Sequence, residues 1–232
     1  MAAARSLGLA AQLDALERFH GPAADPAPAG VFETILWESC AYLVDDARRI
    51  EVYARLEREV GLTPEAILAA APSRLADVIA AGGMQPEHRS RKLLDAAALA
   101  AEAGGPRGMK KLIRESPQRA RRLLRKFPGV GEPGADHLMV LAGALVAIAP
   151  ESNGLRVLTR LGYGSAEGSY PTQYRSAAAA VRDQLPDDRV WLLRARALLR
   201  RHGQGTCRRA APACEECPLK TGCRWFASRR RA

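Results

Sequence analysis

The chain has 232 residues, enough to bury a sizeable core as one large domain or two smaller ones, and its 47% hydrophobic and 26% charged residues are typical of a soluble globular protein. The longest apolar run, residues 138–149, is too short to span a bilayer and predicts a buried core helix. Arg5, Asp14 and Glu17 lie too close together in the N-terminal segment for a signal peptide, so we expect a cytoplasmic protein without a membrane partner.

The net charge of +10 is unevenly distributed along the chain. Residues 105–126 contain nine Lys or Arg and one acid, and residues 194–232 contain eleven Lys or Arg and two acids. Two basic segments of this kind favour a surface that binds a polyanion. Solvated helix faces in an arginine-rich chain are the alternative explanation.

Apolar residues recur at helical spacing and no stretch alternates as a strand would, so the sequence predicts an all-α fold. A proline-rich connector over residues 21–30 separates the first expected helix from the second. The expected helices, delimited by cap residues, prolines and glycines, cover about residues 4–19 and 31–44, begin at 63–65 and at 73, cover 86–103, and begin near 116–117 and at 133.

The segment 31–44 is apolar on nearly every side, so it should form a central buried helix. Glu38 is the exception within it. Beside Trp37, Cys40 and Tyr42, this carboxylate is either a functional acid whose pKa is raised by burial or a glutamate on a water-exposed side of the helix. Cys40 is most simply a small core residue.

Residues 116–142 read as a helix, a tight glycine turn and a second helix, with Pro133 in the position of a first helical residue. The turn is centred on Phe127 to Gly131. Because Gly129 and Gly131 lack side chains, the backbone can turn sharply and its N–H groups can approach an anion such as a nucleic-acid phosphate. An ordinary helix–helix connection with glycine in the turn is the alternative.

Four of the five cysteines lie within seventeen residues near the C-terminus, with the spacing C-x6-C-x2-C-x5-C: Cys207, Cys214, Cys217 and Cys223. In a chain expected in the cytoplasm this density indicates a metal site rather than disulfides. Thiolates at these intervals suit a tetrahedral zinc ion or an iron–sulfur cluster. Zinc ribbons usually pair two C-x2-C knuckles and this chain has one, which favours the cluster.

The glycine turn, the cysteine spacing and residues 200–203 together resemble the endonuclease III superfamily of helix-hairpin-helix DNA glycosylases, and the resemblance extends from Phe32 to Trp225. It implies two α-helical domains. One is a six-helix barrel over residues 24–147 that contains the hairpin, and the other is an iron–sulfur cluster domain made from residues 1–23 and 148–232. The resemblance also implies that the four cysteines hold a structural [4Fe–4S] cluster.

Members of this superfamily act in base-excision DNA repair on nucleotides flipped out of the duplex, because a stacked base hides the bond to be cut. We therefore expect a monomer in the nucleoid whose partner is double-stranded DNA with a damaged base or an abasic site. Leu43 stands where the family commonly has glutamine, and an apolar side chain can fill an unstacked step. The residues expected to face DNA are Gly129, Val130 and Gly131 in the hairpin, Arg208 and Arg209 in the cysteine loop, and the candidate wedges Leu43, Met84 and Gln85.

The catalytic lysine of the bifunctional family members has no counterpart here. That lysine lies two residues after the second hairpin glycine, where this chain has Pro133. Asp136 and His137 cannot form a Schiff base, and the whole chain has five lysines against thirty arginines. The family's usual lyase chemistry is therefore not expected.

The family's catalytic aspartate begins a segment of the form Asp-Ser/Thr-Asn/His-x-x-Arg-Val, and residues 151–157 of this chain read Glu-Ser-Asn-Gly-Leu-Arg-Val. Glu151 keeps the carboxylate on an arm one methylene longer. It is either catalytic, stabilising positive charge on the sugar or orienting water, or it caps the helix that follows Pro150.

The first functional hypothesis is a hydrolase that releases a damaged base as a monofunctional DNA glycosylase, with Glu151 as the candidate acid. The second is a lesion-binding protein that keeps the hairpin, the cluster and the cleft without the chemistry. The third is an abasic-site endonuclease that uses other residues, to which Glu38 or Asp45 and Asp46 would contribute.

Overall fold

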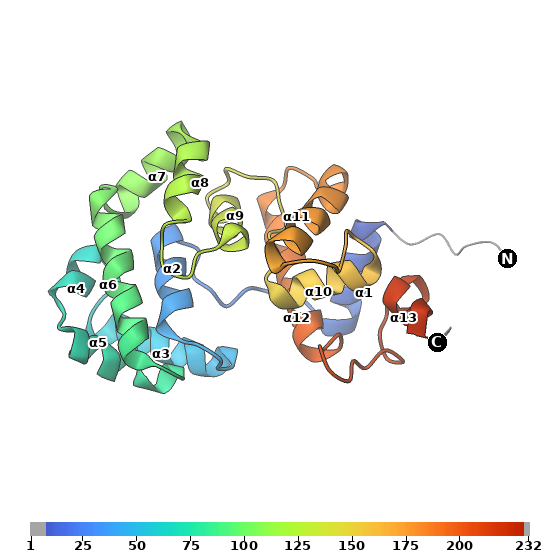
Figure 1. Cartoon of the computed structure of the whole chain (residues 1–232), viewed down its shortest axis with the longest axis horizontal. Coiled ribbons are helices and arrows are strands. Elements are labelled where there is room, and N and C mark those ends of the chain that lie inside the picture. The colour runs from blue at the N-terminus through green and yellow to red at the C-terminus, as the bar shows by residue number, and fades with distance from the viewer. Residues whose placement is uncertain (1–7, 230–232) are drawn as a thin grey trace. The chain divides into compact units, whose positions relative to one another are not determined.

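The structure, a computed structural model, describes residues 8–229, and the regular elements in that range are helices (Figure 1). The first nine α-helices are α1 (Leu9–His20), α2 (Val31–Cys40), α3 (Asp46–Glu59), α4 (Pro64–Ala69), α5 (Pro72–Val78), α6 (Pro86–Glu102), α7 (Gly105–Glu115), α8 (Pro117–Leu124) and α9 (Glu132–Leu141). The remaining α-helices are α10 (Ser152–Leu161), α11 (Tyr170–Val181), α12 (Arg189–Gly205) and α13 (Arg224–Arg229). Three short 3₁₀ turns are η1 (Ala80–Gly82), η2 (Arg182–Gln184) and η3 (Lys220–Gly222). The all-α expectation is confirmed.

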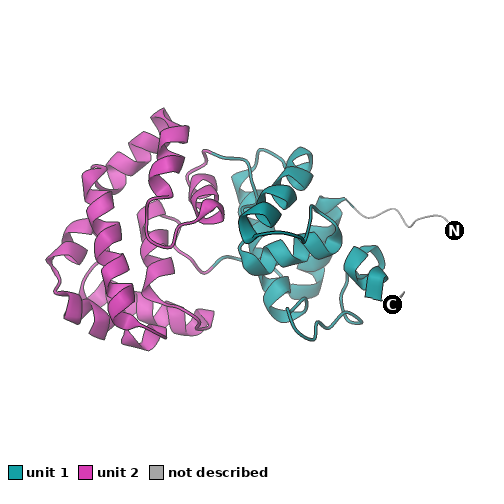
Figure 2. Ribbon diagram, in the orientation of Figure 1, with its two compact units in different colours: residues 1–25, 145–232 teal, residues 26–144 magenta. Residues whose placement is uncertain are grey.

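The chain forms two compact units, shown in different colours in Figure 2. Unit 1 consists of residues 1–25 and 145–232, and unit 2 consists of residues 26–144. In unit 1, α12 packs against both α1 and α10, and the buried side chains of Leu13, Leu158 and Leu198 lie in the core between them. In unit 2, α6 packs against α2, α4 and α5.

Thr63 caps α4 as expected, whereas the helix expected from Ser73 begins at Pro72 and has no side-chain cap. The side chain of Asp45 accepts a hydrogen bond from the Arg48 N–H at 2.8 Å at the start of α3, and Thr63 accepts from the Ala66 N–H at 3.2 Å at the start of α4. Such side chains satisfy N–H groups that have no partner within the helix. The helix that was expected to begin at Pro86 runs to Glu102, close to its expected end.

The expectation of one buried helix over residues 138–149 is wrong. Helix α9 ends at Leu141, and Gly143 adopts a left-handed conformation with φ 71°. Its N–H bonds to the Val140 carbonyl at 2.9 Å, which closes the helix. The apolar residues that follow, including the buried Ile148, form an irregular segment leading into unit 1. No helix in residues 8–229 combines the length and hydrophobicity needed to cross a membrane.

Two further helix bounds differ from expectation. Helix α2 ends at Cys40 instead of continuing to residue 44, because Ala41 is extended and the Tyr42 N–H bonds to the Gly82 carbonyl at 2.8 Å. This contact makes an isolated parallel bridge between Tyr42 and Gly83. Helix α1 begins at Leu9, and the earlier part of the helix expected from residue 4 lies outside the described residues. Cys40 is fully buried, as expected of a core residue.

Candidate functional site

The glycine turn in unit 2 joins α8 to α9 as the sequence predicts. Phe127 is buried beneath it, and the Val130 N–H donates to the Phe127 carbonyl at 3.0 Å. Gly129 has φ 80° and is exposed, so this position requires the left-handed conformation that glycine adopts without strain. Gly131 is extended and exposed, and a Cβ there would meet only Pro133, at 3.8 Å. The sharp turn therefore depends on Gly129, whereas Gly131 leaves the backbone open to solvent.

An acidic residue follows the turn, and a cation from α8 neutralises it. Glu132 is the first residue of α9, and Arg121 lies 3.3 Å from its Oε1 atom. Arg121 also makes a short ion pair with Asp136, one turn further along α9. The hydrogen bond with Asp136 raises the pKa of Arg121 above its usual value, and the hydrogen bond and charge of Glu132 add to this increase. The pairing offsets negative charge that would otherwise repel a phosphate at the hairpin.

Pro133 lies in the first turn of α9, where its missing N–H is not needed by the helix. It provides no amine at the position of the family's lysine. None of the five lysines lies in α9. The structure therefore offers no nucleophilic amine on this helix.

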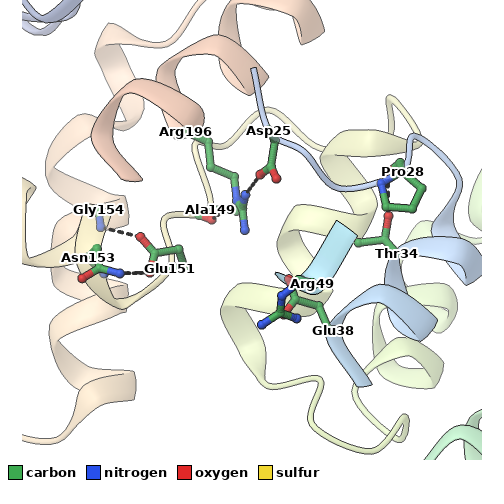
Figure 3. Close-up of polar contacts among 10 residues, drawn as sticks. All are labelled: Asp25, Pro28, Thr34, Glu38, Arg49, Ala149, Glu151, Asn153, Gly154 and Arg196. Carbon is green, nitrogen blue, oxygen red and sulfur yellow. Dashed lines mark hydrogen bonds and ion pairs between the residues drawn. The ribbon is translucent and has the colours of Figure 1, made fainter. Parts of the chain in front are cut away.

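Glu151 is the N-cap of α10 in unit 1 (Figure 3). Its Oε1 atom accepts a hydrogen bond from the Gly154 N–H at 2.8 Å. Its Oε2 atom accepts from the main-chain N–H and the side-chain amide of Asn153, at 2.8 and 2.9 Å, and from the Ser152 hydroxyl at 3.4 Å. The carboxylate thus caps α10 with both of its oxygens. Capping by itself does not prevent the same carboxylate from acting as an acid or base.

The backbone just before Glu151 is held by contacts that the sequence did not predict. Ala149 has φ 47°, which is strained for a residue with a Cβ. Arg196, 8% exposed, donates to the Ala149 carbonyl at 3.2 Å and makes a short ion pair with Asp25 (Figure 3). Burial raises the pKa of Tyr170, and the negative charge of Glu151 adds to that shift. Asp25 lies in the proline-rich connector, and no pattern in the sequence links it to Arg196.

Glu38 is on the water-exposed side of α2, with 57% of its side chain exposed. Its Oε2 atom lies 3.6 Å from an Arg49 guanidinium nitrogen (Figure 3). Of the two alternatives for Glu38, the glutamate on a water-exposed side of the helix is therefore the one observed, and the buried functional acid is not.

The candidate wedge residues of unit 2 are brought together by the bridge between Tyr42 and Gly83. Leu43 is 74% exposed and Met84 is 61% exposed. Leu43 and Gln85 have φ values of 56° and 57°, both left-handed. Two exposed turns with apolar tips therefore lie side by side, although 41 positions separate Leu43 from Met84 in the sequence.

The four cysteines of the C-terminal loop line one cavity, together with Arg160, Trp225 and Phe226 among others. An Arg160 guanidinium nitrogen lies 3.4 Å from the Cys207 sulfur, and the guanidinium stacks over the Trp225 ring at 4.2 Å from its centroid. The His202 Nε2 atom lies 3.5 Å from the Cys217 sulfur. Polar groups thus surround sulfur atoms that face a common space.

Four cysteines that line one cavity are a donor set that can hold an iron–sulfur cluster or a zinc ion. A zinc with four sulfur ligands at about 2.3 Å would hold them about 3.8 Å apart. In the described part of the chain, no three His, Cys, Asp or Glu side chains are close enough to hold one ion. Burial raises the pKa of Cys217 to about 11 and also raises those of Cys214 and Cys223, so holding them as thiolates at neutral pH requires a bound cation.

Arg208 and Arg209 are exposed on the cysteine loop. Arg160 supports their backbone, donating to the Arg208 carbonyl at 2.8 Å and to the Arg209 carbonyl at 3.2 Å. Both arginines line an open pocket that also includes Ser152 and Asn153 at the start of α10. Arg156 lines the pocket too, so it combines three arginines with a helix N-terminus, a combination that attracts anions.

No family model matches the chain. Endonuclease III from Thermotoga maritima is 27% identical to it over 173 residues, which are 74% of this chain and 72% of that protein.

Solved structures agree with this similarity at the level of the fold. A trapped endonuclease III–DNA covalent intermediate matches with a TM-score of 0.74 and 23% identity, covering 96% of this chain and 97% of that one. A thermostable thymine-DNA glycosylase matches with a TM-score of 0.69 and 19% identity, covering 95% of each chain. The expected helix-hairpin-helix glycosylase fold is confirmed: the chain has the fold of endonuclease III and of the thymine-DNA glycosylase, and it is similar in sequence to endonuclease III.

Proposed function

We propose that the protein acts in base-excision repair: it binds damaged duplex DNA, flips one nucleotide out of the stack and hydrolyses the bond between base and sugar. The similarity to endonuclease III supports this proposal. So do the exposed glycine hairpin and the anion-attracting pocket with Arg208 and Arg209. Flipping requires something to fill the vacated space, and the exposed turns with Leu43, Met84 and Gln85 supply it.

One observation supports a monofunctional enzyme: Pro133 lies in α9 at the position where the resemblance places the lysine of bifunctional relatives. Without an amine at that position, no Schiff base forms there, and water is the nucleophile. The bond between the base nitrogen and the sugar C1′ breaks with its electron pair leaving on the base. The water oxygen then bonds to C1′, and the Glu151 carboxylate stabilises positive charge on the sugar and accepts the proton of the water.

The geometry of Glu151 suits this assignment at one of its oxygens. In the described residues, Oε2 accepts three hydrogen bonds and Oε1 accepts one, from Gly154. A carboxylate oxygen has two lone pairs, so Oε1 is the atom that would hold a water molecule. The bonds from Asn153 and Gly154 fix the carboxylate in direction, as a positioned base requires.

The experiment is a screen of purified protein against duplexes that each carry one lesion or an abasic site. Base release without a borohydride-trapped protein–DNA adduct is expected. E151Q keeps one oxygen that can accept a cap bond but removes the charge, so it should lose base release at least about a hundredfold while its helix content and DNA affinity remain. A trapped adduct that depends on one of the five lysines would show that the enzyme is bifunctional.

A lesion-binding protein without catalysis is the second candidate, because both Glu151 oxygens already serve the N-terminus of α10. It predicts tight, lesion-selective binding with no base release from any duplex. If base release does occur and E151Q matches the wild type, Glu151 is a cap and the chemistry lies elsewhere.

We also propose that Cys207, Cys214, Cys217 and Cys223 hold a [4Fe–4S] cluster, which would brace the loop carrying Arg208 and Arg209. The common cavity of the four cysteines supports this assignment. Anaerobically purified protein should contain iron and acid-labile sulfide in equal amounts, and zinc in their place would overturn the assignment. Gel filtration of the same sample tests the expected monomer.

A further inference from the structure

The two exposed turns of unit 2 are joined through one buried side chain, that of Arg89 in α6. Arg89 is only 3% exposed. Its guanidinium makes a short hydrogen bond to the Cys40 carbonyl, at the entry to the turn that contains Leu43. The same side chain donates to the Gly83 carbonyl at 2.8 Å and, from Nε, to the Met84 carbonyl at 2.9 Å.

A further bond from Arg89 goes to the Ile79 carbonyl at 3.0 Å, before η1. One planar group therefore binds four main-chain oxygens from two segments of the chain. Arginine suits this task, because its five N–H donors have a fixed fork geometry, whereas lysine presents three donors from a single atom. The burial of the guanidinium lowers its pKa from the usual value, and the carbonyl oxygens compensate for the lost hydration.

The two segments also approach too closely for side chains at two positions. A Cβ on Gly82 would lie 2.5 Å from the Cys40 carbonyl oxygen and 2.7 Å from an Arg89 guanidinium nitrogen. Gly83 has φ 101°, and a Cβ there would lie 2.2 Å from the Tyr42 carbonyl oxygen. Gly82 thus makes room for the guanidinium between the segments, and Gly83 allows the close approach to Tyr42.

Beyond this contact, each turn adopts a conformation that its residue does not favour. Leu43 and Gln85 are left-handed at φ 56° and 57°, and a non-glycine residue there costs about 1 kcal/mol or more. Leu43 directly follows Tyr42, whose N–H bonds to the Gly82 carbonyl. Gln85 directly follows Met84, whose carbonyl accepts a hydrogen bond from Arg89. Strained, exposed turns persist only when the surrounding structure holds them.

We propose that Arg89 is the positioning residue of the wedge: it locks the two turns together so that Leu43, Met84 and Gln85 point outward as one unit. This inference rests on the proposed function for its use in DNA, but the locking itself is a property of the free protein. Arg89 does not touch DNA in this scheme, and it acts only through the turns.

The test compares R89M, which keeps the length of the side chain without the donors, with R89K and with the control R91M. Arg91 lies two residues further along α6, is exposed and bonds only within its helix, to the Glu87 carbonyl at 3.3 Å in the described structure. Hydrogen exchange in the free protein should show residues 40–44 and 80–85 exchanging about tenfold faster or more in R89M, because buried carbonyls lose their partners. The hairpin amides, including Val130, should exchange as in the wild type.

The second arm measures flipping with a fluorescent adenine analogue placed beside the lesion. R89M should lose most of the fluorescence rise at saturating protein while binding undamaged duplex nearly as the wild type does, R89K should recover part of the signal, and R91M should behave as the wild type. If R89M does not fold, R89K carries the test with the same expected directions.

Unchanged exchange and unchanged flipping in R89M or R89K would overturn the inference. Faster exchange throughout unit 2, rather than in the two turns, would overturn it as well, because Arg89 would then serve general stability. If the wild type itself flips no base, the proposed function fails, and the exchange comparison alone decides whether Arg89 sets the turns.

Discussion

The Arg196 guanidinium donates to the carbonyl oxygen of Ala149 at 3.2 Å, two residues before Glu151. The bond holds the strained conformation of Ala149 at φ 47°, and the Asp25 carboxylate holds the guanidinium in turn. The N-terminal connector thus reaches the residue that leads into the candidate catalytic carboxylate, all within unit 1. Positioning of Glu151 depends on a contact between segments distant in the sequence.

R196M should lower the free energy of unfolding by about 2–3 kcal/mol, because it removes a mostly buried cation from its carboxylate and its carbonyl. It should also reduce base release more than DNA binding, since Glu151 loses its fixed approach. R201M is the matched control: Arg201 lies on the same helix and bonds the Pro22 carbonyl at 3.2 Å, but its contact is exposed. Equal effects of the two substitutions in denaturant titrations would contradict this account.

E151A should lower the free energy of unfolding by about 1 kcal/mol, because α10 loses the acceptor for the Asn153 and Gly154 N–H groups. E151D and E151Q retain an acceptor oxygen, so their free energy of unfolding should fall by less than that of E151A. Thermal and denaturant unfolding of the three variants measures the cap separately from the chemistry. If E151Q lowered the free energy of unfolding more than E151A does, the helix cap would not be what Glu151 contributes to stability.

R121Q should weaken binding to undamaged duplex about fivefold at low salt, because Glu132 and Asp136 then place uncompensated negative charge at the hairpin. The double variant R121Q/E132Q should recover part of the affinity, since one of the two acids is removed. Affinity measured for the wild type, both single variants and the double variant gives the coupling between Arg121 and Glu132. A double variant as weak as R121Q would indicate that Arg121 contacts phosphate itself.

C217S should abolish stable iron binding, whereas C40S should leave the iron content unchanged. Cys40 is fully buried, and burial raises its pKa to about 12, so it is neither a ligand nor a reactive thiol. A serine there can still donate to the Trp37 carbonyl, which the Cys40 sulfur contacts at 3.3 Å. Iron analysis of both variants after anaerobic purification is the measurement, and iron loss from C40S would contradict the assignment of the four C-terminal cysteines.

Much of the fold follows from local signals. The start of α4 at Thr63-Pro64, the course of α6 from Pro86, and the turn at Gly129 were all predicted from residues adjacent in the sequence. The wrong helix prediction occurs where hydrophobicity was the only signal in the sequence. The apolar run 138–149 looks helical, yet Gly143 ends the helix, and the remaining apolar residues find cover as irregular chain.

The helical class, the glycine hairpin, the cysteine spacing and the proline at position 133 can be recognised without a structure, because each depends on residues that are neighbours along the chain. Three relationships became visible only in the folded chain: Glu151 caps α10, Arg196 bonds the Ala149 carbonyl, and Arg89 joins the turns that contain Leu43 and Met84. Arg89 and Cys40 are 49 positions apart, and Arg196 and Ala149 are 47 apart. The partners of a buried guanidinium are chosen by packing between elements, which no local pattern records.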